Sequence, residues 1–223
     1  MRIYHGSDHI LKTPEYGKGK KYNDYGQGFY CTQDIDLARE WSVEHERDGY
    51  VNTYELDDSD LRLLDLNSEK WCVLHWLAIL LQNRRFELES PLAREARRYL
   101  KEYYMPDLSD ADIIRGYRAD DSYFSFAQDF INGVISVSQL NRAMHLGKLG
   151  EQLFLKSQKA FDRIRFIESE SVSADVWYDR KKNRDLSARR AYRNMSKEDY
   201  VKGDLYMIRI LDEEVKPDDP RLQ

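Results

Sequence analysis

Two short stretches near the start of the chain hold residues whose types and spacing suit the binding of a ligand. Residues 2 to 7 end an apolar run on His5 and Gly6, and residues 26 to 32 present Tyr30 after two glycines. β-Branched and aromatic residues bounded by Gly, Ser and Asp predict a short strand in each stretch. A glycine beside the histidine allows a ligand to approach the backbone, and the tyrosine offers a flat surface to a planar ligand. We therefore expect both strands to border a cleft.

The hydrophobic pattern indicates the elements that position these residues. Residues 8 to 25 have no period and predict a loop, which is either a lid over a ligand or a solvated connection. Residues 34 to 47 have helical spacing with Asp34 as the N-cap. Residues 51 to 56 alternate as a strand, and residues 61 to 66 continue it or form another.

The spacing of the hydrophobic residues changes twice in the second half of the chain, from strand-like to helical and back. Residues 68 to 147 predict a helical insertion, in which Ile113 and Ile114 form a short strand or helix. Residues 151 to 155 and 164 to 167 predict strands again. The predicted units are a main domain, residues 1 to 168, and a helical C-terminal extension, residues 169 to 223.

Composition narrows the class of protein. The chain has 223 residues, of which 41% are hydrophobic and 34% charged, and this predicts one folded domain with a charged surface. Its net charge of −5 argues against a protein that grips nucleic acid by overall basicity. The start of the chain shows no signal-peptide pattern, and the longest apolar run, residues 72 to 81, is too short to cross a membrane, so we expect a cytoplasmic protein. Cys31 and Cys72 are expected to be buried thiols, and the scattered His residues predict no metal site.

The order of the motifs resembles the ADP-ribosyltransferase superfamily, in its His-Tyr-Glu branch with diphtheria toxin and the poly(ADP-ribose) polymerases. More closely, the chain looks like an uncharacterised bacterial domain family placed in that superfamily. The resemblance rests on three stretches in this order: Tyr4-His5-Gly6-Ser7, Gly28-Phe29-Tyr30-Cys31-Thr32, and a helix that begins Asp34-Ile35-Asp36-Leu37-Ala38-Arg39-Glu40-Trp41. It implies an α+β fold, with two small, split antiparallel sheets around an NAD cleft, a helical insertion and a helical C-terminal extension.

The resemblance assigns roles to residues of the two strands. It implies that His5 hydrogen-bonds a ribose hydroxyl of NAD and that the Gly6 backbone receives the nicotinamide carboxamide. It implies that Tyr30 packs against the nicotinamide ring, where an electron-poor ring between aromatic faces is stabilised by about 0.5–2 kcal/mol per face. Trp41 falls near the position of a second aromatic, with core packing as the alternative. The cofactor-binding set that follows is His5, Gly6, Ser7, Tyr30, Thr32 and Trp41.

A third position opens a late strand, where the superfamily carries Glu, Asp or Gln. Gln152 matches it, with Glu151 beside it, and only one of these neighbours can face the cleft because strand residues alternate between faces. The hydrophobic register of the strand and the closer family pattern both favour Gln152, and the resemblance implies that it is the third catalytic residue, with His5 and Tyr30. Glutamine keeps a hydrogen bond to ribose, but it carries no charge and cannot act as a general base. Slow transfer, transfer to a strong nucleophile, and NAD binding without turnover all stay open.

The function that the resemblance implies is NAD-dependent mono-ADP-ribosylation of an unknown macromolecular acceptor, without a metal. Bacterial relatives of this kind are often toxins or effectors, which implies an antitoxin or immunity protein as a partner. The alternative is a catalytically weak or inactive module with the ADP-ribosyltransferase fold that binds NAD, a protein partner or nucleic acid. The basic run from Arg180 to Arg193 either contacts nucleic acid or an acidic partner, or is a solvated helix surface.

Two weaker pairs of candidates complete the predicted site. Asp120 and Asp121 resemble an acidic pair of the family, which binds ribose or an acceptor, and a helix N-cap explains them equally well. Arg84 and Arg115 are candidates to meet a pyrophosphate, although no Gly-rich cradle accompanies them. The sequence contains neither a dinucleotide-binding Gly-x-Gly-x-x-Gly motif nor a P-loop, so a nucleotide site of those types is excluded.

Overall fold

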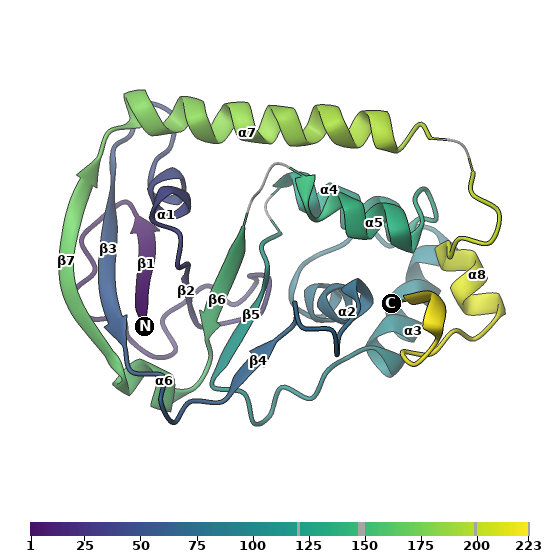
Figure 1. The fold of residues 1–223 in the computed structure, drawn as a ribbon, viewed down its shortest axis with the longest axis horizontal. Helices are drawn as coiled ribbons and strands as arrows, with labels where there is room; N and C mark the ends of the chain where they lie inside the picture. Colours follow the sequence, from purple (N-terminus) through teal and green to yellow (C-terminus); the bar gives the residue numbers. More distant parts are fainter. Residues whose placement is uncertain (120, 147–149, 199, 223) are drawn as a thin grey trace.

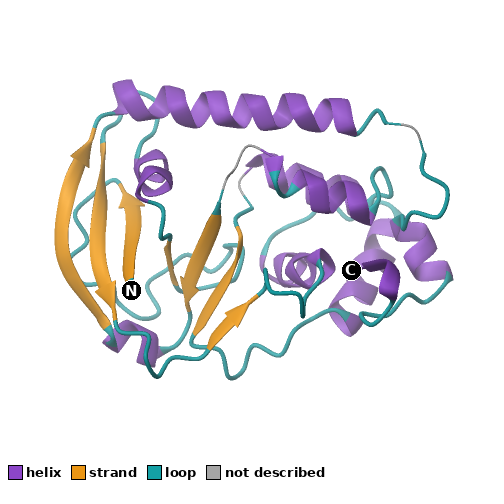
Figure 2. Ribbon diagram, viewed as in Figure 1, coloured by secondary structure: helices purple, strands orange, loops and turns teal. Residues whose placement is uncertain are grey.

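The computed structural model describes residues 1–119, 121–146, 150–198 and 200–222, and it has an α+β fold (Figures 1 and 2). One sheet is antiparallel throughout, in the order β1 (Arg2–Ser7), β3 (Gly49–Leu56), β7 (Ile164–Val172). The other sheet has the order β2 (Phe29–Cys31), β6 (Glu151–Leu155), β5 (Ile113–Tyr117), β4 (Leu63–Asp65). Figure 1 shows the two sheets side by side, with most of the helices beyond the second sheet.

The expectation of two purely antiparallel sheets is wrong for the second sheet, in which β4 and β5 pair in parallel. Parallel neighbours need a long crossover connection, and the helices between residues 66 and 112 supply it. The expected helical insertion, residues 68 to 147, therefore contains a strand. This strand is β5, which pairs with β6 on one side and with β4 on the other. Ile113 and Ile114 are almost fully buried there, and this explains their β-branched, apolar character.

Two helices begin or end at other residues than expected. Helix α1 (Ile35–Ser42) has Asp34 as its N-cap, as expected, but it stops before residue 47 because Val43 is extended and the chain turns between Glu44 and Arg47. Helix α2 (Val73–Asn83) begins five residues after Ser68 and is buried from Val73 to Leu81, as its apolar composition predicts. The remaining helices are α3 (Pro91–Tyr103), α4 (Asp121–Ile131), α5 (Val137–Ala143), α6 (Gln158–Asp162), α7 (Ala174–Met195) and α8 (Met207–Asp212), with a 3₁₀ turn at Pro220–Leu222.

The C-terminal part is less separate than the sequence suggests. Strand β7 continues to Val172, four residues past the expected domain boundary, before α7 begins. Figure 1 shows α7 along one side of the molecule, from the first sheet to the helices around α4. At one end α7 contacts α1, and at the other Tyr192 stacks on Phe126 of α4, with 3.8 Å between ring centroids. The helix therefore ties the two halves of the molecule together.

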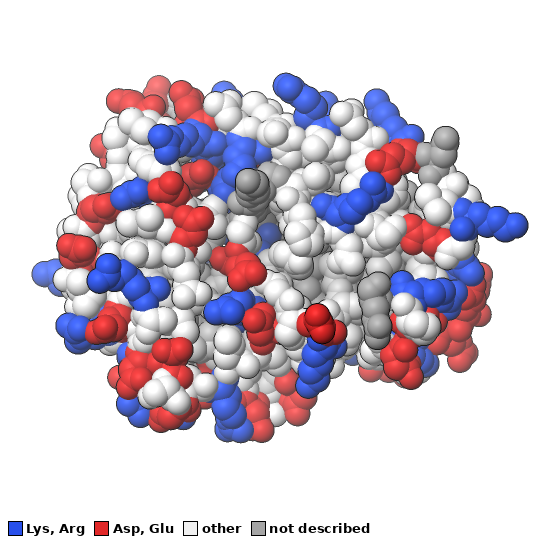
Figure 3. All heavy atoms as spheres, viewed as in Figure 1, with Lys and Arg blue, Asp and Glu red and all other residues white. Residues whose placement is uncertain are grey.

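Both cysteines are free, with Cys31 buried and Cys72 half-buried. Among the described residues, no helix combines the length and the apolar composition that a membrane span requires. Charged residues of both signs are intermingled over the face shown in Figure 3.

Candidate functional site

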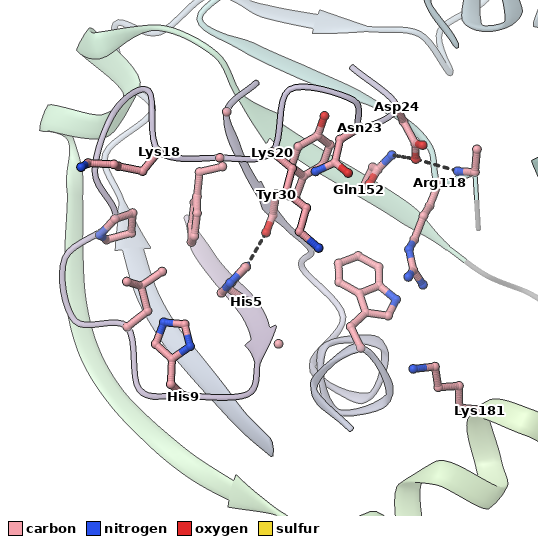
Figure 4. A pocket seen from close by; sticks show the side chains of 18 of the residues that line it. His5, His9, Lys18, Lys20, Asn23, Asp24, Tyr30, Arg118, Gln152 and Lys181 are labelled. Carbon is pink, nitrogen blue, oxygen red and sulfur yellow. Dashed lines mark hydrogen bonds between the residues drawn. The ribbon is translucent and has the colours of Figure 1, made fainter. Parts of the chain in front are cut away.

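A cavity of about 950 Å³ opens beside the two strands that the sequence singles out. This volume is at the upper end of the range usual for small-molecule and cofactor sites. Its walls come from β1, β2, β6, α1, α7 and the loop before β2 (Figure 4). Five of the seven residues predicted to be catalytic or cofactor-binding line it, and they are His5, Gly6, Tyr30, Trp41 and Gln152.

The His5 ring is held by a single strong contact. Its Nδ1 lies 2.7 Å from the backbone oxygen of Tyr30, and the ring packs on Phe29 with 4.6 Å between centroids. A carbonyl oxygen only accepts, so Nδ1 carries the proton and donates it, and Nε2 of the neutral ring is left as an acceptor. Burial lowers the pKa of His5 below its ordinary value of 6.5 and keeps the ring neutral near pH 7.

Gly6 serves two purposes, of which the sequence indicates one. A Cβ at this position would lie 2.1 Å from the backbone oxygen of Ala38, so glycine is required first for the close packing of α1 on β1. Tyr4 exchanges both backbone hydrogen bonds with Thr32, at 2.8 and 2.9 Å, on the edge of β1 opposite β3. Because antiparallel pairs alternate, the N–H and C=O of Gly6, two residues on, point to that same edge. They face the cavity side, as a ligand-binding backbone must.

Tyr30 contributes its ring to the cavity and its hydroxyl to the fold. The hydroxyl donates to the backbone oxygen of Gly26 at 2.7 Å and accepts from the backbone N–H of Tyr25 at 3.0 Å. Burial raises the pKa of the phenol, so it stays protonated as the donor. Gly26 adopts a φ of +93°, which suits glycine, and the phenol thereby fixes the turn at residues 23 to 26. The ring itself packs on Phe154, with 4.9 Å between centroids.

Gln152 is buried and turned toward the cavity, whereas its neighbour Glu151 is exposed and lies 3.8 Å from Arg115. Both hydrogens of the Gln152 amide are used within the protein. Nε2 donates to Asp24 Oδ2 at 2.9 Å and to the backbone oxygen of Tyr117 at 3.2 Å. The amide is thereby fixed, and what it can still offer a ligand is an oxygen acceptor.

Asp24 is the site residue that sequence reasoning misses. It lies in the loop before β2, where no periodic pattern marks it, yet its side chain is only 7% exposed and lines the cavity. Its carboxylate accepts from Arg84 Nη1 at 2.8 Å and from the Ala119 backbone N–H at 2.8 Å. It also accepts from Gln152, as Figure 4 shows. Burial raises the pKa of Asp24. A carboxylate therefore lies one hydrogen bond away from the Gln152 amide.

Other predicted site residues divide into those near the cavity and those away from it. The Trp41 ring lines the cavity beneath the Arg118 guanidinium, 4.7 Å from the ring centroid. Ser7 and Thr32 do not line it, because Ser7 Oγ accepts from Asn52 at 2.9 Å and the buried Thr32 Oγ1 accepts from the backbone of Asp34. These two residues support the loop after β1 and the start of α1.

Of the two weaker arginine candidates, one lines the cavity and the other does not. Arg84 lines the cavity and holds Asp24, but Arg115 lies outside the lining and pairs with Asp65 at 3.2 Å. Asp120 lies outside the described residues, and Asp121 is the first residue of α4. The loop before β2 forms one wall of the cavity through residues such as His9 and Lys20, which favours the interpretation of that loop as part of the site.

Comparison with protein families gives one match, over residues 1–166, to a family described as a protein of unknown function, DUF3990. The chain belongs to the DUF3990 family. Neither the curated proteins nor the solved structures include a match to the chain. The part that matches DUF3990 contains the strands β1, β2 and β6 and the wall formed by the loop, and it ends inside β7.

Helix α7 lies beyond the DUF3990 match but supplies part of the cavity wall. Eight Lys and Arg side chains line the cavity against three Asp and Glu side chains, in a chain whose net charge is −5. Four of the basic residues, Lys181, Lys182, Arg184 and Arg189, come from α7. The cavity is therefore positively charged, which favours an anionic ligand.

Proposed function

We propose that the protein is an NAD-dependent mono-ADP-ribosyltransferase, with an ADP-ribosyltransferase-like arrangement of its two sheets around the cavity. The observation that carries the proposal is the meeting of His5, Gly6, Tyr30 and Gln152 at one cavity, from strands far apart in sequence. Their order in the chain matches the motifs of that superfamily. The excess of basic side chains around them suits the charge of a dinucleotide.

The nicotinamide end of NAD fits the edge of β1. A carboxamide has one donor and one acceptor side, and the N–H and C=O of Gly6 point together toward the cavity edge of the strand. The hydrogen bond from His5 to the backbone oxygen of Tyr30 connects the two strands at this point. The ring of Tyr30 supplies an aromatic surface beside that edge. The nicotinamide would lie between these two features.

The ribose fits the two side chains that present acceptors. Nε2 of neutral His5 and the oxygen of Gln152 both accept, and the hydroxyls of ribose donate. Neither side chain can turn away easily, because His5 is tied to Tyr30 and Gln152 is tied to Asp24 and Tyr117. Such fixed partners hold the sugar in one orientation, which is the main contribution of positioning to catalysis.

In the reaction, the bond between the ribose C1′ and the nicotinamide nitrogen breaks, and the electron pair leaves with nicotinamide. Positive charge develops on the ribose as an oxocarbenium-like state. A nucleophile of the acceptor then bonds to C1′ and loses its proton. Gln152 carries no charge, but the Asp24 carboxylate behind it is fixed by Arg84 and Ala119 before the charge develops. Preorganised charge of this kind stabilises a developing cation without reorganisation.

One observation favours a second candidate, a module that binds NAD without turning it over. Gln152 cannot act as a general base, and Asp24 is occupied by three donors. In this candidate the cavity recognises the nucleotide, and the cellular effect comes from a partner that senses the bound state.

The test is incubation of the purified protein with labelled NAD in a cell lysate, with nicotinamide release and label transfer as readouts. We expect both to be lost in His5→Ala and Gln152→Ala and to persist in Glu151→Ala, the matched control on the exposed face of the same strand. Binding of NAD without release would favour the second candidate. If the wild type neither binds nor cleaves NAD, both candidates are refuted.

A further inference from the structure

The basic run that begins at Arg180 is not a solvated helix surface along its whole length. Tyr178, Lys181, Lys182, Asp185 and Arg189 line the cavity, and their spacing places them along one side of α7. This side continues the cavity wall on the part of the chain beyond the DUF3990 match. The charged groups on this side of α7 therefore come from outside the DUF3990 match.

The position of α7 is well fixed against α1. Lys181 Nζ donates to the backbone oxygen of Val43 at 2.9 Å, and Arg184 pairs with the buried carboxylate of Glu40. At its start, the Trp177 ring lies under the Arg39 guanidinium, 5.3 Å from the centroid. The basic residues of α7 therefore belong to a helix that packs against the main fold.

The acidic residues of the lining are each matched by a basic one. Asp24 pairs with Arg84 at 2.8 Å and Asp185 with Arg189 at 2.8 Å, while Glu15 lies 3.9 Å from Lys18. The rest of the charged lining, His residues aside, is basic. The buried Glu40, which lies outside the lining, pairs with Arg184, and the lining itself holds more basic than acidic side chains.

Figure 4 shows how part of this excess is arranged. The charged ends of Lys20, Arg118 and Lys181 point into the cavity from the loop before β2, the segment after β5, and α7. The Arg118 guanidinium lies over the Trp41 ring, so the cations stand next to an aromatic surface. Cations that converge from separate segments suit adjacent phosphate groups, because each phosphate offers several oxygen acceptors.

We propose that Lys20, Arg118 and the Lys181–Lys182 side of α7 form a subsite for the diphosphate of a nucleotide. The subsite deepens the proposed function, because it places the phosphates of the nucleotide in the same cavity. It also makes the C-terminal helix part of the binding site.

The test is calorimetric binding of ADP, AMP and adenosine to the full chain, in which turnover plays no part. Lys20→Ala, Arg118→Ala and Lys182→Ala remove one cation each, and Lys181 is left intact because it holds α7 to Val43. Arg190→Ala is the matched control, since Arg190 lies on α7, is exposed and is not part of the lining. We expect each of the three variants to bind ADP about tenfold more weakly, the loss of one charged hydrogen bond, with adenosine unaffected. The control should bind ADP as the wild type does.

Two further readings separate this proposal from its alternatives. ADP that binds tighter than adenosine, with a difference that shrinks at high salt, supports the subsite even if no nicotinamide is ever released. Equal affinities for ADP and adenosine, or ADP binding that is unchanged in all three variants, would overturn it. So would a single-stranded oligonucleotide that binds tighter than ADP and is weakened equally by Arg190→Ala, because the cations would then act as an exposed nucleic-acid surface.

Discussion

Replacing Gln152 by Glu tests the pairing of Gln152 with Asp24. The change introduces a carboxylate at this position and is conservative by volume. In this structure, however, it would place a second carboxylate where Nε2 now donates to Asp24 Oδ2 at 2.9 Å. We therefore expect Gln152→Glu to destabilise the protein, and to do so more strongly as the pH rises.

The size of the destabilisation follows from comparing two states of the variant: both carboxyl groups charged, or one of them protonated. Two full charges about 3 Å apart repel by about 6 kcal/mol with an effective dielectric constant of about 20. Protonating one carboxyl group of ordinary pKa costs only about 4 kcal/mol of free energy at pH 7, so the variant is expected to protonate one of the two groups. This free-energy cost falls to about 1 kcal/mol at pH 5. The folded state then binds a proton that the unfolded chain lacks above its ordinary pKa, so its stability falls as the pH rises. The expected slope is about 1.4 kcal/mol per pH unit between pH 5 and 7.

The assay is urea unfolding followed by tryptophan fluorescence at several pH values between 5 and 7. Gln152→Met removes the same hydrogen bonds without adding a charge, so its loss of stability should depend on pH less steeply than that of Gln152→Glu. Adding Asp24→Asn to Gln152→Glu leaves a single carboxylate, and the slope should largely disappear. If Gln152→Glu shows the same pH dependence as the wild type, the two side chains do not form the close pair that we describe.

Two other predictions concern β1. Gly6→Ala should lower the free energy of unfolding by about 2–3 kcal/mol, because its Cβ would lie 2.1 Å from the Ala38 oxygen and α1 must shift; urea unfolding measures this, and unchanged stability would contradict the close packing of α1 on β1. Because burial lowers the pKa of His5 below 6.5, its Nε2 should remain an acceptor, and NAD affinity should stay constant down to that pH and fall below it. Calorimetric titration across this range checks the second prediction, and a loss of affinity centred above pH 6.5 that His5→Asn removes would contradict it.

Local patterns in the sequence determine many of the elements. Residue types identify β1 and β6, helical spacing identifies α1, and Asp34 caps that helix as its type predicts. The strand period also determines that only one of Glu151 and Gln152 faces inward, because neighbouring residues point to opposite faces, and the structure shows that it is Gln152. These features depend on residues close together in the chain, and the sequence contains them directly.

Tertiary structure alone decides how distant segments combine at the cavity. Asp24 lies in a loop without a pattern, and its role depends on Arg84, Ala119 and Gln152, which come from three other segments. A glycine is required at position 6 because the backbone of α1 lies too close for a Cβ, and no local pattern in the sequence shows this. In the same way, the basic run of α7 lines a cavity because the helix packs across α1, and a composition count cannot tell a cavity wall from a solvated surface. The sequence determines which groups are present, and long-range packing determines which of them meet.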